Sequence, residues 1–304
     1  GMQTKEEDVL RDIFYASSHD TVLFFSDKGK VYSEIAYRIP ETGRANRGTL
    51  IQSVLPLGQD EAITAILPVT SFEQEGWYFV MATKHGRIKR VDLQEFSEVR
   101  PSGLIAINLN EDDYLGWVKY SNGEQDIVLV TESGQSIRFN ENDVRAMGRT
   151  AGGVNAIKLA DDDRVAGMDV ITEEHSHVLV ITTKGFGKRT RIEEYPVQSR
   201  YGLGVRTLAR NPKIGVVAAM RVVKEDDELM LVTRSGVVLR TNLQSIRETG
   251  RATQGVIVMN CKGNDEVVGI AVMKAEDNGE IDADLVVDGA ETSEQAVDPA
   301  MNGA

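Results

Sequence analysis

The chain contains 304 residues, of which 41% are hydrophobic and 27% are charged, and its formal net charge is −13. These values are typical of a globular protein with a sizeable core; no apolar run approaches the roughly 20 residues of a membrane-spanning helix, and the acidic start is untypical of a signal or transit peptide. The single cysteine, Cys261, excludes an internal disulfide and favours a reducing compartment, so we expect a cytoplasmic protein that does not contact membranes.

Five segments share one pattern: an apolar run, Ser or Thr, two residues, a glycine, three further residues and usually an arginine. They are residues 22–33, 79–90, 127–138, 179–190 and 229–240. Three landmarks recur in one register, namely Gly29, Gly86, Gly134, Gly185 and Gly236; Ile39, Phe96, Val144, Tyr195 and Ile246; and Gly48, Gly103, Gly153, Gly204 and Gly255. Because each landmark recurs every 48–57 residues, the chain is an internal repeat.

Each unit is predicted to form four short strands. The first two flank the turn glycine, which supplies the positive φ of a tight hairpin. The third follows the second glycine, as at 104–109, 154–159 and 256–261, and the fourth follows an acidic turn, as at 62–69, 114–120, 164–170 and 267–273. The expected fold is therefore all-β, a propeller-like array of four-stranded blades with five complete repeats and, at 9–17, the last strand of a sixth.

Basic residues occupy equivalent places in the units. Arginines precede the second glycine at Arg44, Arg47, Arg100, Arg145, Arg149, Arg200, Arg247 and Arg251, and end the second strand at Arg90, Arg138, Arg189 and Arg240, with Lys188 beside Arg189. Acidic clusters lie elsewhere in the unit, before the fourth strand, at 111–113, 161–163 and 265–266. Equivalent positions share one location in a repeat fold, so we predict a positive band along one rim.

A positive band on a curved array suits duplex DNA, bound with little regard to base sequence. The arginines named above are the predicted phosphate contacts, and glycines would let the backbone approach the phosphates. These structural glycines are Gly48, Gly103, Gly153, Gly202, Gly204 and Gly255. Exposed turns also commonly carry arginine without any ligand, and the pattern alone favours neither interpretation.

One pentapeptide, ETGRA, occurs at 41–45 and again at 248–252. It falls at the same place in the first and fifth units, so we interpret it as one loop used twice. Its glycine would shape the turn and its arginine, Arg44 or Arg251, would contact phosphate. The pattern assigns no role to the glutamate that opens it.

Residues 275–304 carry nine acidic residues and no Lys or Arg, which leaves a net charge of −4 on residues 1–274. The segment is also poor in large apolar residues, so we expect a disordered acidic tail after a folded domain over 1–274.

No motif for catalysis, a metal or a cofactor stands out. The stretch 185–190, GFGKRT, lacks the Ser or Thr that follows the lysine of a phosphate-binding loop. His175 and His177 have no third ligand nearby, and Cys261 replaces a leucine of the sister units. We therefore predict no catalytic residue and no metal ligand.

The stretches 43–69, 142–159 and 250–259 resemble the family of C-terminal domains of the DNA gyrase A subunit, and the resemblance extends in collinear order over about 3–274. It implies a six-bladed β-pinwheel that wraps double-stranded DNA around a basic perimeter, so that the holoenzyme introduces negative supercoils. It also implies no activity in this chain alone, because the cleaving tyrosine and the ATP and Mg²⁺ sites lie elsewhere. The implied partners are the remainder of the gyrase A polypeptide and the gyrase B polypeptide in an A2B2 enzyme, at the nucleoid, and the isolated domain is expected to be monomeric.

The family's signature heptapeptide, Gln-Arg-Arg-Gly-Gly-Lys-Gly, is not present; we expect it just before Gly1, and residues 198–204 (QSRYGLG) are its nearest relic. Three alternatives stay open. The chain could be the matching domain of topoisomerase IV, a propeller that binds proteins through its acidic loops, or, with little support because no polar cluster recurs at strand starts, a propeller hydrolase.

Overall fold

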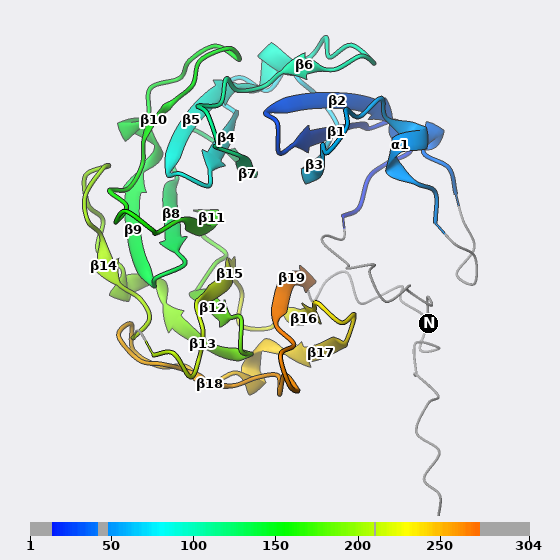
Figure 1. Ribbon diagram of the computed structural model, residues 1–304. Coiled ribbons are helices and arrows are strands. Elements are labelled where there is room, and N and C mark those ends of the chain that lie inside the picture. The colour runs from blue at the N-terminus through cyan, green and yellow to red at the C-terminus, as the bar shows by residue number, and fades with distance from the viewer. Residues whose placement is uncertain (1–13, 42–47, 210, 274–304) are drawn as a thin grey trace, which may run out of the picture.

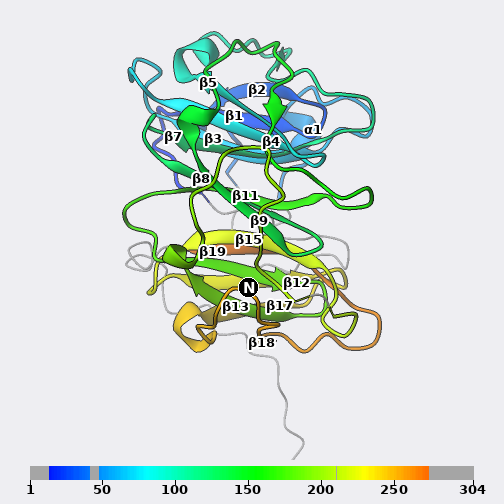
Figure 2. The same ribbon diagram turned by 90° about the vertical axis from the view of Figure 1, so that its left-hand side faces the viewer.

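The computed structural model describes residues 14–41, 48–209 and 211–273. These residues form five antiparallel sheets that follow one another around a central opening (Figure 1). Figure 2, turned by 90°, shows the first sheet at one edge of the molecule and the fourth at the opposite edge. Among the described residues, the arc is open between the fifth sheet and the first (Figure 1). The all-β, propeller-like prediction is confirmed.

The sheets are built as follows, from the inner strand outward. The first contains β3 (Ile63–Val69), β1 (Thr21–Ser26), β2 (Lys30–Ile35) and β6 (Leu104–Ile105); the second β7 (Leu115–Ser121), β4 (Tyr78–Thr83), β5 (Arg87–Asp92) and β10 (Val154–Asn155); the third β11 (Val165–Ile171), β8 (Asp126–Thr131), β9 (Gln135–Asn140) and β14 (Val205–Arg206); the fourth β15 (Val217–Val223), β12 (His177–Thr182), β13 (Phe186–Arg191) and β18 (Val256–Ile257); and the fifth β19 (Val267–Met273), β16 (Glu228–Thr233) and β17 (Val238–Asn242).

Short helices complete the units. A 3-10 turn follows the second strand of each one: η1 (Ala36–Arg38), η2 (Leu93–Phe96), η3 (Glu141–Asp143), η4 (Ile192–Glu194) and η5 (Leu243–Ser245). The α-helix α1 (Ile51–Val54) occurs in the first unit. No helix within the described residues is long and apolar enough to cross a membrane.

The outermost strand of each four-stranded sheet comes from the following unit. Val154 and Asn155 of β10, for example, pair with Ile88 and Arg87 of β5, one unit earlier in the chain. We call the segments that reach back in this way straps; they are residues 97–105, 145–155, 196–206 and 247–257. The prediction that each unit builds its own four-stranded blade is therefore corrected, because the third strand joins the preceding sheet.

The two ends of the arc differ from its middle. Among the described residues, β17 in the fifth sheet has no strap beside it, and its first residue, Val238, and the preceding Val237 are exposed. After Gly48, the first unit forms α1. This helix and the following Leu55 pack against apolar residues of the first sheet. The expected strand at 9–17 is not seen over 14–17, and 9–13 lie outside the described residues.

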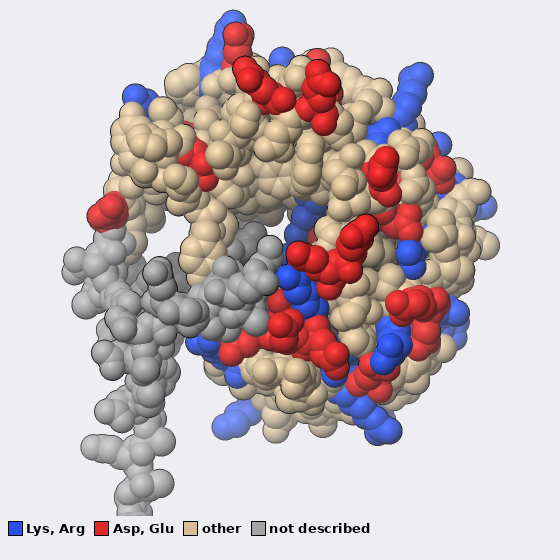
Figure 3. Space-filling model, turned by 180° about the vertical axis from the view of Figure 1, so that it is seen from behind, with Lys and Arg blue, Asp and Glu red and all other residues tan. Residues whose placement is uncertain are grey.

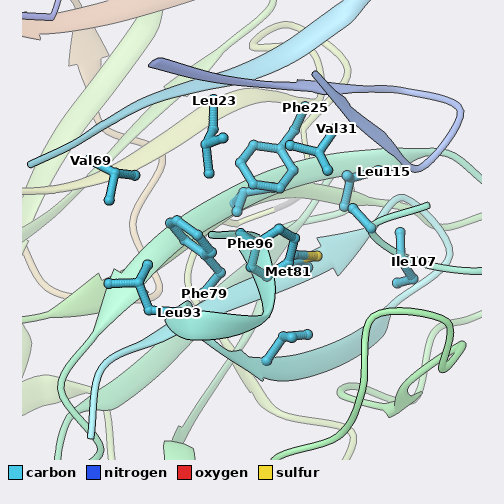
Figure 4. Packing of buried hydrophobic residues seen from close by; sticks show 13 residues of the cluster. Leu23, Phe25, Val31, Val69, Phe79, Met81, Leu93, Phe96, Ile107 and Leu115 are labelled. Atoms are coloured by element: carbon cyan, nitrogen blue, oxygen red, sulfur yellow. The ribbon is translucent and has the colours of Figure 1, made fainter. Parts of the chain in front are cut away.

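The core lies between adjacent sheets. Leu23 and Phe25 of β1 face Phe79 and Met81 of β4, and Phe96 of η2 closes the cluster (Figure 4). The rings of Phe25 and Phe79 lie 5.5 Å apart and those of Phe79 and Phe96 5.1 Å apart, both edge to face. Burying one such side chain contributes about 1.5–3 kcal/mol. β4 is apolar on both faces, because Phe79 and Met81 pack in this cluster and Val80 and Ala82 pack in the next one. This packing holds neighbouring units together and fixes the rim positions.

Candidate nucleic-acid interface

Three of the four straps cross the outer strand of the preceding sheet at two points. Besides the antiparallel pairing, Ala146, Val197 and Glu248 form parallel bridges with Arg90, Arg138 and Arg189. The next residue of each strap donates its N–H to the carbonyl oxygen of that arginine, at 2.9 Å for Met147, 2.7 Å for Gln198 and 2.9 Å for Thr249. The three straps are therefore held in equivalent positions.

Four strap glycines have left-handed backbone: φ is 82° at Gly103, 78° at Gly153, 70° at Gly204 and 78° at Gly255. A Cβ at Gly153 would lie 2.5 Å from the carbonyl oxygen of Ile88, and one at Gly204 would lie 2.2 Å from that of Ser136. These glycines are needed because the strap lies directly on the sheet beneath it; the predicted approach of the backbone to phosphate stays a prediction.

Gly48 and Gly202 are different from the other predicted structural glycines. Neither has a positive φ. A Cβ at Gly48 would meet nothing within 4 Å, and one at Gly202 would lie 3.6 Å from the nearest atom, the Cδ1 atom of Ile137. The structure gives no steric reason for glycine at these two positions.

The arginines that end the second strands connect neighbouring units. Arg90 donates from Nη1 to the buried carboxylate of Glu141 at 3.0 Å. Arg138 donates from Nη1 to the carbonyl oxygens of Ile192 and Tyr195, at 3.1 and 3.2 Å, and Arg189 from Nε to that of Ile246, at 2.8 Å. Each side chain thus reaches the 3-10 turn of the next unit.

The prediction that Arg90, Lys188 and Arg189 contact DNA is therefore wrong. Their exposed fractions are 6%, 0% and 6%, and each of them donates to a protein oxygen. Arg138 is largely covered in the same way. Arg240 is exposed, because no strap covers β17, and it pairs with Glu228.

The strap arginines lie at the outer edge. Arg100, Arg145 and Arg247 are exposed, whereas Arg149, Arg200 and Arg251 are half-buried. Each of the half-buried three donates from Nη1 to a carbonyl oxygen of the strap before it, namely that of Ile105, Asn155 and Arg206 respectively. A guanidinium carries five N–H groups, so these residues link straps in a row and keep donors for a ligand. Arg44 and Arg47 lie outside the described residues.

Two buried lysines, one of which sequence reasoning overlooked, support two of the straps. The ammonium of Lys89 donates to the carbonyl oxygens of Gly148, Arg149 and Ala151. Lys188, predicted instead to contact DNA, donates to those of Gly250 and Arg251. Burial, with a smaller effect of the nearby Arg149 guanidinium, lowers the pKa of Lys89 to about 7. Burial also lowers the pKa of Lys188 to about 8, although the nearby Glu194 carboxylate opposes this shift.

The glutamate of the repeated pentapeptide anchors a strap. Glu248 bonds Nε2 of His177 at 2.8 Å and accepts from Nε of Arg191 at 2.9 Å, both in the preceding unit. The hydrogen bonds from His177 and Arg191 lower the pKa of the Glu248 carboxyl. This contact assigns a role to the residue that the sequence pattern left unexplained.

The acidic turns lie away from the straps. Asp113, Asp163 and Asp265 each accept from a backbone N–H beside a turn glycine, at 2.9, 3.0 and 3.1 Å. Burial raises the pKa of Asp265, but hydrogen bonds from Ser235 outweigh it and bring the value to about 2. Figure 3 shows Asp and Glu gathered over one face of the ring, with Lys and Arg projecting at its outer edge and a few beside the central opening.

The cations of the central opening are mostly paired. A cavity of about 860 Å³ between the innermost strands is lined by Lys84, Lys119, Arg164, Arg221 and Arg234. Lys119 and Arg221 both contact Asp169, at 3.4 and 3.0 Å, and Arg234 contacts Glu266 at 3.3 Å. Among the residues that the structure describes, exposed arginines therefore recur from unit to unit at the outer edge and not at the central opening.

Comparison with known proteins agrees with the propeller-like fold. The family model described as "DNA gyrase C-terminal domain, beta-propeller" matches residues 20–70, 78–118, 125–172, 176–224 and 227–274. The chain is 41% identical over 280 residues to the DNA gyrase A subunit of Salmonella typhimurium, covering 92% of this chain and 32% of that protein. It is 38% identical over 298 residues to the DNA gyrase A subunit of Escherichia coli K12, covering 98% and 34%. The chain thus spans about a third of the length of these relatives.

Two solved structures share the architecture. The crystal structure of the C-terminal domain of DNA topoisomerase IV superposes with a TM-score of 0.78 at 26% identity, covering 85% of this chain and 80% of that one. A structure of the DNA gyrase A C-terminal domain superposes with a TM-score of 0.74 at 26% identity, covering 85% and 84%.

Proposed function

We propose that this chain, which belongs to the family of DNA gyrase C-terminal domains, binds duplex DNA along its strap-bearing edge and bends it around the arc. The observation that carries the proposal is the row of strap arginines, in which Arg149, Arg200 and Arg251 each bond the preceding strap. Arg145 and Arg247, at equivalent places in two straps, are exposed. Cations that recur from one strap to the next are suited to the repeated phosphates of a duplex.

Bending explains why many equivalent contacts are needed. Curving a stiff duplex by tens of degrees costs about 1–6 kcal/mol per site. Single exposed ion pairs stabilise little, so the cost has to be offset by contacts from several units together. The arc supplies four straps at successive positions along the edge, and none of them is a helix that could enter the major groove and read bases.

The family supports a proposal for the role in the whole protein. We propose that the chain acts within the gyrase A polypeptide, which assembles with gyrase B into an A2B2 enzyme at the nucleoid in the cytoplasm. Wrapping would bias ATP-driven strand passage toward negative supercoils, while the cleaving tyrosine and the ATP and Mg²⁺ sites belong to other domains. By itself the domain would be a monomer without catalytic activity.

A second candidate is the equivalent domain of topoisomerase IV. The observation that favours it is the TM-score of 0.78 to such a domain, against 0.74 to the gyrase A domain. The identities of 38% and 41% to gyrase A sequences favour the first candidate. A supercoiling assay of the full-length enzyme separates the two, because the gyrase candidate predicts that relaxed plasmid becomes negatively supercoiled.

The salt dependence of DNA binding tests the interface. We expect the affinity of the chain for linear duplex DNA to fall steeply with salt, and the double variant Arg145→Ser, Arg247→Ser to lower the log–log slope by about 2, at roughly 0.9 per phosphate contact. The control is Arg164→Ser, which removes an exposed cation at the central opening. An equal loss of affinity in the control, or no salt dependence in the unmodified chain, would argue against the interface.

A further inference from the structure

Two of the strap arginines lie in matching clusters of three charges. Lys188, Glu194 and Arg251 form one cluster, and Lys89, Glu95 and Arg149 form the other. In both, the lysine lies three residues after the turn glycine and the glutamate nine residues after it. At these two positions the first unit has Tyr32 and Arg38, and the third unit has Ile137 and Asp143. The units that lack the lysine thus also lack the glutamate.

The lysine turns the strap backbone in a defined direction. Nζ of Lys188 lies 2.9 Å from the carbonyl oxygen of Gly250 and also bonds that of Arg251. In a planar trans peptide the N–H points opposite to the C=O. The N–H groups of Arg251 and Ala252 therefore point away from the buried ammonium, toward the outer face of the strap.

An anion already occupies that outer face. The carboxylate of Glu194 accepts the outward N–H of Arg251 at 3.0 Å. The same oxygen lies over Gly250, 3.6 Å from where a Cβ would be. In the other cluster, the carboxylate of Glu95 lies 3.9 Å from Nε of Arg149. A backbone N–H beside an arginine is the kind of site that binds phosphate oxygens, and the carboxylate stands in for one.

We infer that the strap around Arg251 is a phosphate site that the Glu194 carboxylate fills in the free protein and that a phosphate of the DNA backbone takes over on binding. Glu95 has the same role toward Arg149, with a looser contact. Lys188 and Lys89 act as positioning residues, because they present the strap N–H groups to the ligand without touching it. The inference rests on the proposed function and adds to it a carboxylate of the same chain that competes with the DNA phosphate for the site.

The variant Glu194→Gln tests the site. Glutamine keeps the size of the side chain but is a weaker acceptor for the Arg251 N–H, so a phosphate has to displace only a weaker hydrogen bond. The control is Glu193→Gln, which removes the same charge from the same exposed turn. We expect Glu194→Gln to bind linear duplex DNA about two- to fivefold more tightly than Glu193→Gln, the range of an exposed ion pair.

The outcomes are distinct. Equal affinity of the two variants would mean that only net charge matters and would overturn the inference. Weaker binding by Glu194→Gln would also overturn it, because Glu194 would then help to bind DNA. If the unmodified chain shows no salt-dependent binding, the proposed function fails first. An inorganic phosphate titration followed by the amide signal of Arg251 adds a local readout, in which Glu194→Gln shifts at lower phosphate than Glu193→Gln.

The lysine is tested by its effect on the glutamate. Lys188→Ile introduces the residue that the third unit has at this position, so the fold accepts it. Without the ammonium the strap N–H groups are no longer directed outward, and we expect Glu194→Gln to give no advantage over Glu193→Gln in this background. A full two- to fivefold gain in the Lys188→Ile background would show that the lysine does not position the site.

Discussion

Arg90 and Arg145 are both arginines of the repeat, yet Arg90 is buried and Arg145 is exposed. The difference arises because a strap from the next unit covers the end of each second strand and leaves the strap's own outer surface open. The sequence could identify the basic positions of the repeat but not their exposure, which depends on a chain segment some fifty residues away. For the same reason it could not show that Lys89 lies beneath a strap.

The buried lysines predict how stability varies with pH. The pKa values of Lys89 and Lys188, about 7 and about 8 in the folded chain, lie below the ordinary value of 10.5. Between these limits the unfolded chain binds more protons than the folded chain, so the free energy of unfolding should rise with pH from about 7 to about 10.5. The double variant Lys89→Met, Lys188→Met should lose most of this rise.

Urea unfolding of both proteins at pH 6.5 and pH 9.5 checks this expectation. Other groups also titrate over this range, so the informative quantity is the difference between the two proteins in their change with pH. The same increase in stability in the variant as in the unmodified chain would show that the two ammonium groups are not desolvated by folding.

At the level of elements, the hairpins of each unit were predictable and the exchange of the third strand was not. The Ser or Thr and the turn glycine of the pattern mark a local hairpin, so the pairing of its two strands with each other follows from the local sequence. A two-residue strand such as β10 carries too little pattern to specify its partner, and the repeat makes neighbouring sheets equally suitable. The left-handed φ of Gly255 and its contact with the fourth sheet are consequences of that exchange.

The strap glycines predict a contrast in stability. A Cβ at Gly255 would lie 2.5 Å from the carbonyl oxygen of Gly187, at a φ of 78° that disfavours side chains. Gly255→Ala should therefore cost about 1–3 kcal/mol of unfolding free energy. Gly202→Ala, in the preceding strap, has no such clash and should change it by less than about 0.5 kcal/mol. Urea denaturation of both variants checks the contrast, and equal losses would mean that the straps do not lie on the sheets as described.

At the level of the whole molecule, the repeat and the resemblance together predicted a propeller-like array with a basic edge. Whether the array closes could not be predicted, since closure depends on contacts between the first and last units. The described sheets form an open arc, with β17 at one end and α1 at the other (Figure 1). The expected acidic tail over 275–304 lies outside the described residues, and its disorder stays a prediction.

The central claim is that duplex DNA bends around the strap-bearing edge, and energy transfer between dyes on the two ends of a linear duplex of about 60 base pairs tests it most directly. Free DNA of this length is nearly straight, because it is shorter than the persistence length of about 150 base pairs. We predict that saturating chain at low salt raises the transfer efficiency, and that the Arg145→Ser, Arg247→Ser variant raises it less at equal occupancy. Saturated binding with no change in transfer efficiency would contradict the account.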